Sequence, residues 1–310
     1  MGSPDEEHRG RPRLKHRAEH LLLRGVLGSF GALAPGSALG RGARLGRLWR
    51  VLDRRHRGLA ERNIAAALGL PPAEARRVAL ACFEHLGRTL AEFALGPERF
   101  GDLRARFEVE GLERFHAALA AGRGVFLLSG HCGNWELFGA RLALEAPMTT
   151  VARAMSNPLS DDALEQRRRA AGVRTVDARN ASRGILRALG RGETVGVLLD
   201  QNASRGERVF TTFFGRPAAT SFGLALLALK TGAPVLPVFS VRRPDGTHAG
   251  WVGEPIEPAP GADRAERIGR TTARYTAAIE DFVRRHPEQW FWVHNRWKRV
   301  PEQGEPVWSP

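Results

Sequence analysis

The chain has 310 residues, of which 43% are hydrophobic, enough for one large core or for a core with a helical appendage. It carries 47 basic and 33 acidic residues, and the formal net charge of +14 indicates a polyanionic partner: nucleic acid, an anionic membrane surface, or acidic substrates and carriers. Its two cysteines, Cys82 and Cys132, are too few for a disulfide scaffold or a four-ligand zinc site.

The first part of the chain is predicted to be helical. We expect residues 1–12 to be disordered and residues 13–97 to form a helical N-terminal region, with a helix start at Pro71-Pro72. Residues 21–40 are apolar or small apart from Arg24, are interrupted by glycine and proline, and lie between basic clusters. This pattern is poor for a helix that spans a bilayer and favours an interfacial membrane anchor. The alternative is an ordinary amphipathic helix packed on the domain.

Residues 98–310 are predicted to form an α/β core. Strands are expected at residues 107–110, 125–128, 148–152, 174–176, 195–199 and 234–241, and helices at 78–95, 112–121, 136–145, 158–171, 182–189 and 271–285. Because these strands alternate with helices, we predict an α/β fold whose mostly parallel sheet is flanked by helices.

The most informative motif follows the apolar strand at residues 125–128. His131 comes just after Gly130, and Glu136 follows five positions later at the start of a helix. Residues five apart on a straight helix point about 140° away from each other, so His131 must lie in the loop with Glu136 folding back toward it. A carboxylate on one ring nitrogen would raise the basicity of the other. The alternative is a loop histidine and a solvated first-turn glutamate.

The hexapeptide His131-Cys132-Gly133-Asn134-Trp135-Glu136 resembles the H-x4-[DE] box of the late lipid A acyltransferases, in the lysophospholipid acyltransferase superfamily. Cys132 is a departure, since the family usually has an aromatic residue there. Further blocks resemble the family in the same order along the chain: residues 151–159, 168–172, 192–201, 213–220, 231–237 and 275–298. The resemblance therefore covers most of the chain.

The resemblance implies an O-acyltransferase in which His131 is the general base and Glu136 orients it. His131 would deprotonate a hydroxyl, which then attacks an acyl thioester, and backbone N–H groups near Gly133 and Asn134 would stabilise the oxyanion. No metal or redox cofactor is implied. The donor would be an acidic acyl carrier protein or acyl-CoA, and the acceptor a membrane lipid. The expected location is the cytoplasmic face of the inner membrane.

Three further residues are predicted to bind substrate. Arg168, with Arg153 behind it, would hold a phosphate of the acceptor or of a phosphopantetheine arm, because a guanidinium matches such anions. Arg168 lies in a run of three arginines, so a solvated helix face is the alternative. Asp200 ends a predicted strand at the carboxyl edge of the sheet, where α/β proteins place ligands, although a structural role is equally compatible.

Several alternatives in function remain at this point. The acceptor could be a lipid A precursor, a phosphatidylinositol mannoside or a lysophospholipid. A basic nucleic-acid-binding protein would explain the charge, but zinc-finger spacing and an RNP-like aromatic motif are missing. A serine hydrolase or nucleotide enzyme is disfavoured because the chain contains neither G-x-S-x-G nor a Walker A sequence.

Overall fold

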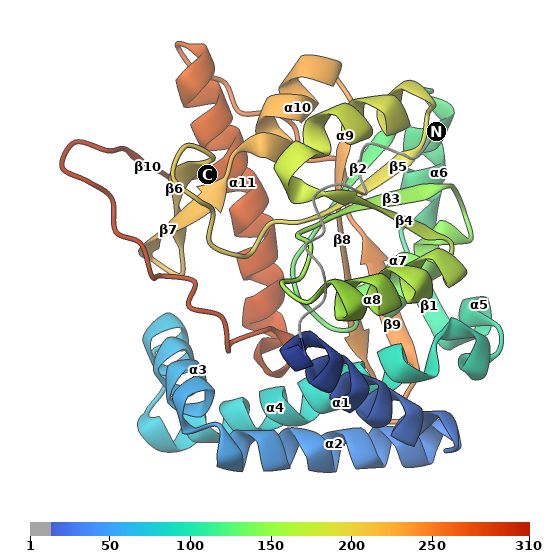
Figure 1. Ribbon diagram of the computed structural model, residues 1–310. Coiled ribbons are helices and arrows are strands. Elements are labelled where there is room, and N and C mark those ends of the chain that lie inside the picture. The colour runs from blue at the N-terminus through green and yellow to red at the C-terminus, as the bar shows by residue number, and fades with distance from the viewer. Residues whose placement is uncertain (1–13) are drawn as a thin grey trace.

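The computed structural model describes residues 14–310, apart from the side chains of residues 98 and 100. Helices of the N-terminal region lie along one end of an α/β body (Figure 1). They are α1 (Leu14–Gly31), α2 (Pro35–Leu52), α3 (Arg54–Leu68) and α4 (Pro72–Leu95). Helices are thus present where they were predicted, and α4 begins at Pro72, but the bounds of the N-terminal region stay a prediction. The expectation for residues 1–12 lies outside the described residues.

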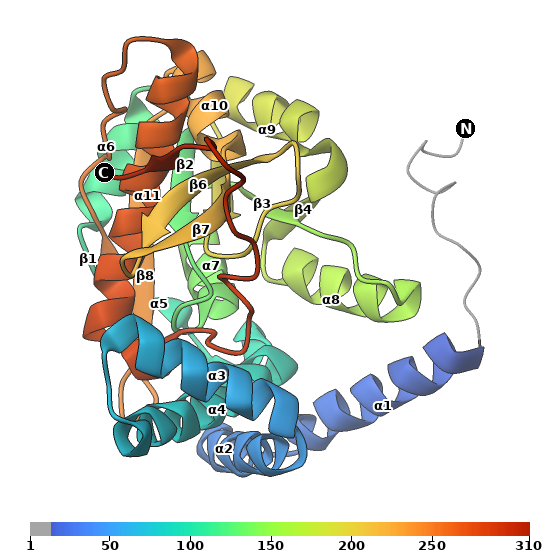
Figure 2. The ribbon, with the colours of Figure 1, turned by 90° about the vertical axis from the view of Figure 1, so that its left-hand side faces the viewer.

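The segment at residues 21–40 is divided between two helices, because α1 ends at Gly31 and Pro35 begins α2. Leu27 and Phe30 pack into the core, whereas Leu21 and Leu22 are 66% and 71% exposed. The start of α1 lies below α8 (Pro158–Ala170) (Figure 2), and the Asn157 side chain donates to the His16 carbonyl and to Glu19. Within residues 14–310, every helix is too short or too polar to cross a membrane. An interfacial anchor stays a prediction.

The α/β body is built on a seven-stranded sheet with the strand order β1-β9-β8-β2-β5-β3-β4. Its strands are β1 (Phe107–Glu110), β2 (Val125–Ser129), β3 (Met148–Ala152), β4 (Val173–Asp177), β5 (Thr194–Leu198), β8 (Val235–Arg242) and β9 (His248–Val252). All neighbouring strands are parallel except β8 and β9. The predicted mostly parallel sheet is confirmed.

Helices cover both faces of this sheet. Accordingly, β2 is buried on both sides apart from Ser129, and its alternate side chains point into two different cores. Phe126 and Leu128 join the core under one set of helices, and Val125 and Leu127 join the core under the other. The first set is α9 (Ala181–Gly190), α10 (Gly223–Thr231) and α11 (Arg264–Arg285), and the second includes α6 (Leu112–Ala120) and α7 (Trp135–Ala143). Beside α7 lies α8 (Pro158–Ala170) (Figure 1).

Sequence reasoning missed some elements. β6 (Arg208–Phe213), β7 (Arg216–Ser221) and β10 (Val307–Trp308) form a separate three-stranded sheet. Both residues that join β6 to β7 have positive φ, and only the second is a glycine, so the usual hairpin signal was incomplete. Helix α11 begins earlier than predicted, where the Asp263 side chain accepts the Glu266 N–H as an N-cap. Short helices are η1 (Pro97–Phe100), α5 (Leu103–Arg106), η2 (Ala178–Asn180) and η3 (Pro287–Gln289).

The register of two neighbouring strands positions the site. In the parallel pair β2 and β5, Ser129 lies opposite Leu198. Both strands therefore end at the same place, and the chain that leaves them carries His131 on one side and Asp200 on the other. Two residues that are 69 positions apart in the sequence are thus brought together at the carboxyl edge of the sheet.

Candidate active site

A cavity of about 740 Å³ lies at this edge of the sheet. Its polar lining includes His131, Glu136, Arg153, Arg168, Gln201 and His294. Its apolar lining includes Phe138, Leu142, Met148, Ile185, Leu224 and Leu227. The cavity thus combines titratable groups with an extended hydrocarbon wall. Within residues 14–310, no group of three or more His, Cys, Asp or Glu side chains is arranged to hold a metal ion.

His131 forms a dyad with Asp200. The ring Nδ1 lies 2.8 Å from Asp200 Oδ1, and the backbone N–H of His131 donates to Oδ2 at 2.8 Å. The indole N–H of Trp290 donates to the same Oδ2, also at 2.8 Å. On the opposite side of the ring, the amide nitrogen of Gln201 lies 3.3 Å from Nε2. Nδ1 is therefore held as the donor, and Nε2 is left as the acceptor beside a residue that lines the cavity.

Asp200 is only 2% exposed, yet it remains ionised at neutral pH. Burial by itself would raise the pKa of this carboxyl. The charge that His131 carries when it is protonated, and the hydrogen bonds from His131 and Trp290, outweigh burial and hold the pKa well below its usual range. An ionised carboxylate at Nδ1 fixes the tautomer and would stabilise an imidazolium formed during a reaction.

The predicted pairing of Glu136 with His131 is wrong. Glu136 accepts two hydrogen bonds from Arg168, at 2.6 Å from Nη2 and 3.1 Å from Nε. Glu136 sits in the first turn of α7 and Arg168 in the last turn of α8, so the carboxylate turns toward α8 and not back to the loop. Burial lowers the pKa of the Arg168 guanidinium, but Glu136 outweighs burial and the pKa is raised. Glu136 therefore orients an arginine at the cavity wall.

The arginines of the run at residues 167–169 have different surroundings. Arg168 lines the cavity, whereas Arg167 donates to the carbonyl oxygens of Phe93 and Ala94 near the end of α4. Arg169 is largely exposed, so of the three arginines only Arg169 fits the alternative of a solvated helix face. Arg153, which follows β3, also lines the cavity; the pKa of Asp177 is lowered mainly by hydrogen bonds from Arg179, and the charge of Arg153 adds to this. The anion-binding roles of Arg153 and Arg168 stay predictions.

Gly133 and Asn134 anchor the loop, and neither is among the residues that line the cavity. The Gly133 N–H donates to the Gln289 carbonyl at 2.8 Å, so the predicted oxyanion role of this N–H is wrong. Gly133 has φ 57°, and a Cβ there would lie 1.8 Å from the Ser240 carbonyl oxygen. Asn134 is fully buried, and its Oδ1 caps α7 by accepting the Leu137 N–H.

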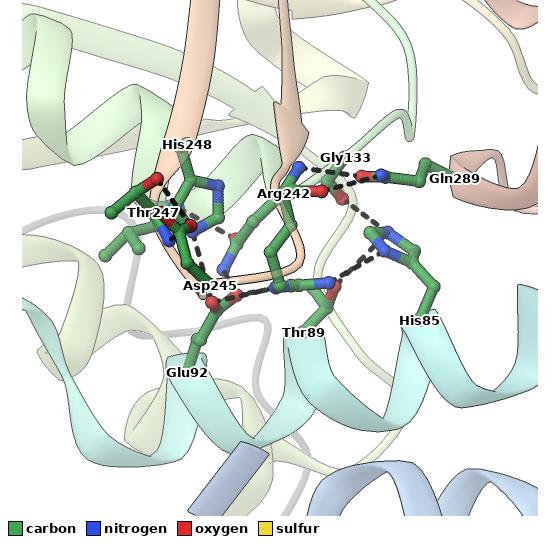
Figure 3. Close-up of polar contacts among 11 residues, drawn as sticks. His85, Thr89, Glu92, Gly133, Arg242, Asp245, Thr247, His248 and Gln289 are labelled. Atoms are coloured by element: carbon green, nitrogen blue, oxygen red, sulfur yellow. Dashed lines mark hydrogen bonds and ion pairs between the residues drawn. The ribbon is translucent and has the colours of Figure 1, made fainter. Parts of the chain in front are cut away.

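A buried polar network behind this loop was missed from the sequence (Figure 3). Arg242 on β8 donates to Glu92 and to Thr89, and it contacts His85, all three of which lie on α4. Glu92 also accepts hydrogen bonds from Asn134 and His248. The available signal was the spacing 85, 89 and 92, which places three polar groups on one face of a helix that otherwise packs into the core.

This network reaches the loop of His131 directly. Nδ1 of His85 accepts from Arg242 at 2.8 Å, so its Nε2 carries the proton and donates to the Gly133 carbonyl at 3.0 Å. Burial, followed by the charge of Arg242, lowers the pKa of His85 well below its usual value, and the ring is neutral. The loop is therefore fixed from both sides, by His85 on α4 and by Gln289 near the C-terminus.

Comparison with known proteins agrees with this arrangement. Residues 11–299 match the family described as bacterial lipid A biosynthesis acyltransferase. The chain belongs to this family. A lipid A biosynthesis palmitoleoyltransferase of Escherichia coli is 31% identical over 265 residues, covering 84% of each chain, and a lauroyltransferase of the same organism is 29% identical over 84% of this chain and 85% of its own. A phosphatidylinositol mannoside acyltransferase of Mycobacterium tuberculosis is 29% identical, covering 76% of this chain and 75% of its own. This member of the lipid A acyltransferase family is an enzyme that transfers acyl groups.

The Glu136–Arg168 pair gives a first prediction for this acyltransferase. Glu136→Gln and Arg168→Gln should each lower kcat/KM by about 10–100-fold, the range for losing a charge-assisted hydrogen bond. Because Glu136 acts through Arg168, the kcat/KM of the double variant should be no more than about 3-fold below that of the less active single variant. Steady-state kinetics of the three variants measure this. If the losses in kcat/KM multiply in the double variant, the two residues do not act jointly and Glu136 has a role of its own.

Proposed function

We propose that the protein transfers a fatty acyl chain from an acyl thioester to a hydroxyl of a lipid A precursor, with His131 as the general base. The observation that carries the proposal is the dyad: Nδ1 of His131 is held by a buried, ionised Asp200, and Nε2 is left as an acceptor in the cavity. Asp200, and not Glu136, takes the orienting role in this proposal.

The chemistry follows from this geometry. Nε2 of His131 removes the proton of the acceptor hydroxyl as its oxygen attacks the thioester carbonyl, and Asp200 stabilises the imidazolium. The tetrahedral intermediate collapses to the ester, and the departing thiolate takes the proton back from Nε2. The apolar cavity wall, which includes Leu142 and Leu224, would hold the acyl chain away from water. The reaction needs no covalent acyl-enzyme.

The basic charge and the N-terminal helices support a membrane location in this proposal. A net charge of +14 favours both an acidic acyl carrier protein and an anionic membrane surface. Leu21 and Leu22 on α1 and Leu48 and Leu52 on α2 are exposed, alongside arginines, as expected for helices that lie at an interface. We place the protein on the inner membrane with its active site on the cytoplasmic face.

A second acceptor class is favoured by one observation. Relatives from two mycobacterial species are named phosphatidylinositol mannoside acyltransferases, and this chain covers about three quarters of their length. The same dyad would deprotonate a hydroxyl of a mannoside. Phosphatidylinositol mannoside is therefore the alternative acceptor.

The test is acyl transfer by the purified protein in detergent. The acceptor is a radiolabelled tetra-acylated lipid A precursor bearing the sugar Kdo, and the donors are lauroyl- and myristoyl-acyl carrier protein. We expect a radiolabelled product with one more acyl chain, and little product from the folded His131→Ala variant. Transfer to phosphatidylinositol mannoside but not to the lipid A precursor would contradict the proposed acceptor. Equal transfer by His131→Ala would contradict the proposed base.

A further inference from the structure

A second cavity, of about 440 Å³, lies next to the active site and has no part in the chemistry described above. We call it the basic recess. It is lined by Arg55, His56, Leu59 and Arg62 on α3, by Trp49 on α2, and by Phe291, Val293, His294 and Asn295 near the C-terminus.

The recess and the catalytic cavity share a wall. His294 lines both of them. Phe291, which lines the recess, has its ring centroid 5.7 Å from that of His131, and its backbone N–H donates to the His131 carbonyl at 3.2 Å. The recess therefore adjoins the place where the substrate reacts at His131.

The recess is suited to an anion. Arg55, Leu59 and Arg62 lie on one face of α3, because they are four and three residues apart. The Arg62 guanidinium lies over Gly58, where an added Cβ would come within 3.2 Å of Nη1, so this side chain runs back toward Arg55. No aspartate or glutamate is among the lining residues.

Both arginines are exposed, and the carboxylates nearest to them in the sequence are bound by other groups. Asp53 binds His56 at 2.6 Å, and Glu61 binds Arg50 at 2.8 Å. Within residues 14–310, neither Arg55 nor Arg62 forms an ion pair. Their charges are therefore available to a ligand, and a guanidinium binds phosphate through two parallel hydrogen bonds.

We infer that the basic recess binds a phosphate group of a substrate while the reacting hydroxyl or thioester lies at His131. This inference rests on the proposed acyl transfer. The phosphate has two chemical sources: the phosphate of a phosphorylated glycolipid acceptor, and the phosphodiester in the pantetheine arm of an acyl thioester donor.

The variant that tests the recess is Arg55→Ala/Arg62→Ala. Its matched control is Arg76→Ala/Arg77→Ala, which removes two exposed arginines from the neighbouring α4, away from both cavities. We expect the KM for one substrate to rise by about 10-fold or more in the recess variant, with kcat within about 2-fold, because binding and not chemistry is weakened. The control should have wild-type KM values.

Two substrate analogues identify the source of the phosphate. If the acceptor supplies it, removing the acceptor's phosphates should raise the wild-type KM, with no further rise in the recess variant. If the donor supplies it, an acyl-N-acetylcysteamine thioester, which contains no phosphate, should react equally well with wild-type protein and the recess variant. KM values in the recess variant that equal those of the control for both natural substrates would overturn the inference.

A binding measurement separates this inference from the proposed function. Inorganic pyrophosphate is titrated into the full-length protein, and the melting temperature is followed. We expect pyrophosphate to raise the melting temperature of wild-type protein and of the control, and to raise that of the recess variant less. Equal shifts in all three proteins would overturn the anion site, even if acyl transfer is observed. A loss of the shift in the recess variant would support the site even if the lipid A precursor is not the acceptor.

Discussion

Replacing His131 by alanine should lower the turnover of acyl transfer by about 10²–10⁴-fold, the usual contribution of a general base. The His131 side chain is mostly enclosed, but its loop is held by backbone contacts of Gly133 and Phe291 that do not depend on the ring. The variant should therefore fold, and circular dichroism together with the melting temperature checks this. A folded variant that keeps turnover within about 5-fold of wild type is incompatible with His131 as the base.

The Asp200→Asn variant tests the orienting carboxylate more sharply. Oδ2 of Asp200 receives two N–H donors, from the His131 backbone and from Trp290. Asparagine has only one oxygen, which must take this position, so its NH2 group is left facing Nδ1 of His131. Nδ1 then becomes an acceptor and the ring proton moves to Nε2, which can no longer accept a proton from the substrate.

We therefore expect Asp200→Asn to lower turnover by about 10²–10⁴-fold, similar to the loss of the base itself, with little change in fold. Nitrogen NMR of labelled histidine should show the protonated ring nitrogen change from Nδ1 to Nε2. Asp281→Asn, at an exposed carboxylate on α11, is the control and should be fully active. An Asp200→Asn protein whose His131 keeps its proton on Nδ1 would refute the tautomer argument.

Replacing Arg242 by methionine should lower the free energy of unfolding by about 3–5 kcal/mol, because it leaves a buried carboxylate without its cation. Glu92 is completely buried and Arg242 nearly so. The double variant Glu92→Leu/Arg242→Met should be less destabilised than the sum of the two single variants, since neither charge then remains unpaired. Urea denaturation measures each value.

Arg243 supplies the matched control for this substitution. It follows Arg242 in the chain and pairs with Glu108, but that ion pair is exposed on the surface. Arg243→Met should cost no more than about 1 kcal/mol. Equal losses from Arg242→Met and Arg243→Met would show that the buried network contributes nothing particular to stability.

Acid should weaken the same network. Burial alone would raise the pKa of Glu92, but the charge and hydrogen bonds of Arg242, followed by those of His248, outweigh it and hold the pKa far below its usual range. At a pH between the pKa of Glu92 in the folded chain and its pKa of about 4.3 in the unfolded chain, only the unfolded chain binds the proton. The contribution of Glu92 is thus complete above pH about 4.3 and is lost as the pH falls toward the folded pKa.

Much of the fold could be predicted from local patterns. The strands β1, β2 and β3 and the helices α6 and α8 lie within one or two residues of their predicted bounds, because each has a clear hydrophobic period and a clear end. The hairpin β6–β7 was missed because its turn, Phe214-Gly215, has a weak signal. Strand β9 was missed although Pro244-Asp245-Gly246 is a clear turn signal just before it.

The sequence by itself determined that His131 follows a buried strand, that Glu136 lies in a first helical turn, and that the chain resembles an acyltransferase family. Only the tertiary structure decided which groups touch. Asp200 reaches His131 because β5 pairs with β2, although β3, β4 and three α-helices separate these strands in the sequence. Glu136 binds Arg168, and Glu92 binds Arg242, 150 positions away, for the same reason. Such contacts are determined by the strand order and by helix packing. Both depend on the burial of segments that are far apart in the sequence, so the spacing of residues within one segment cannot predict them.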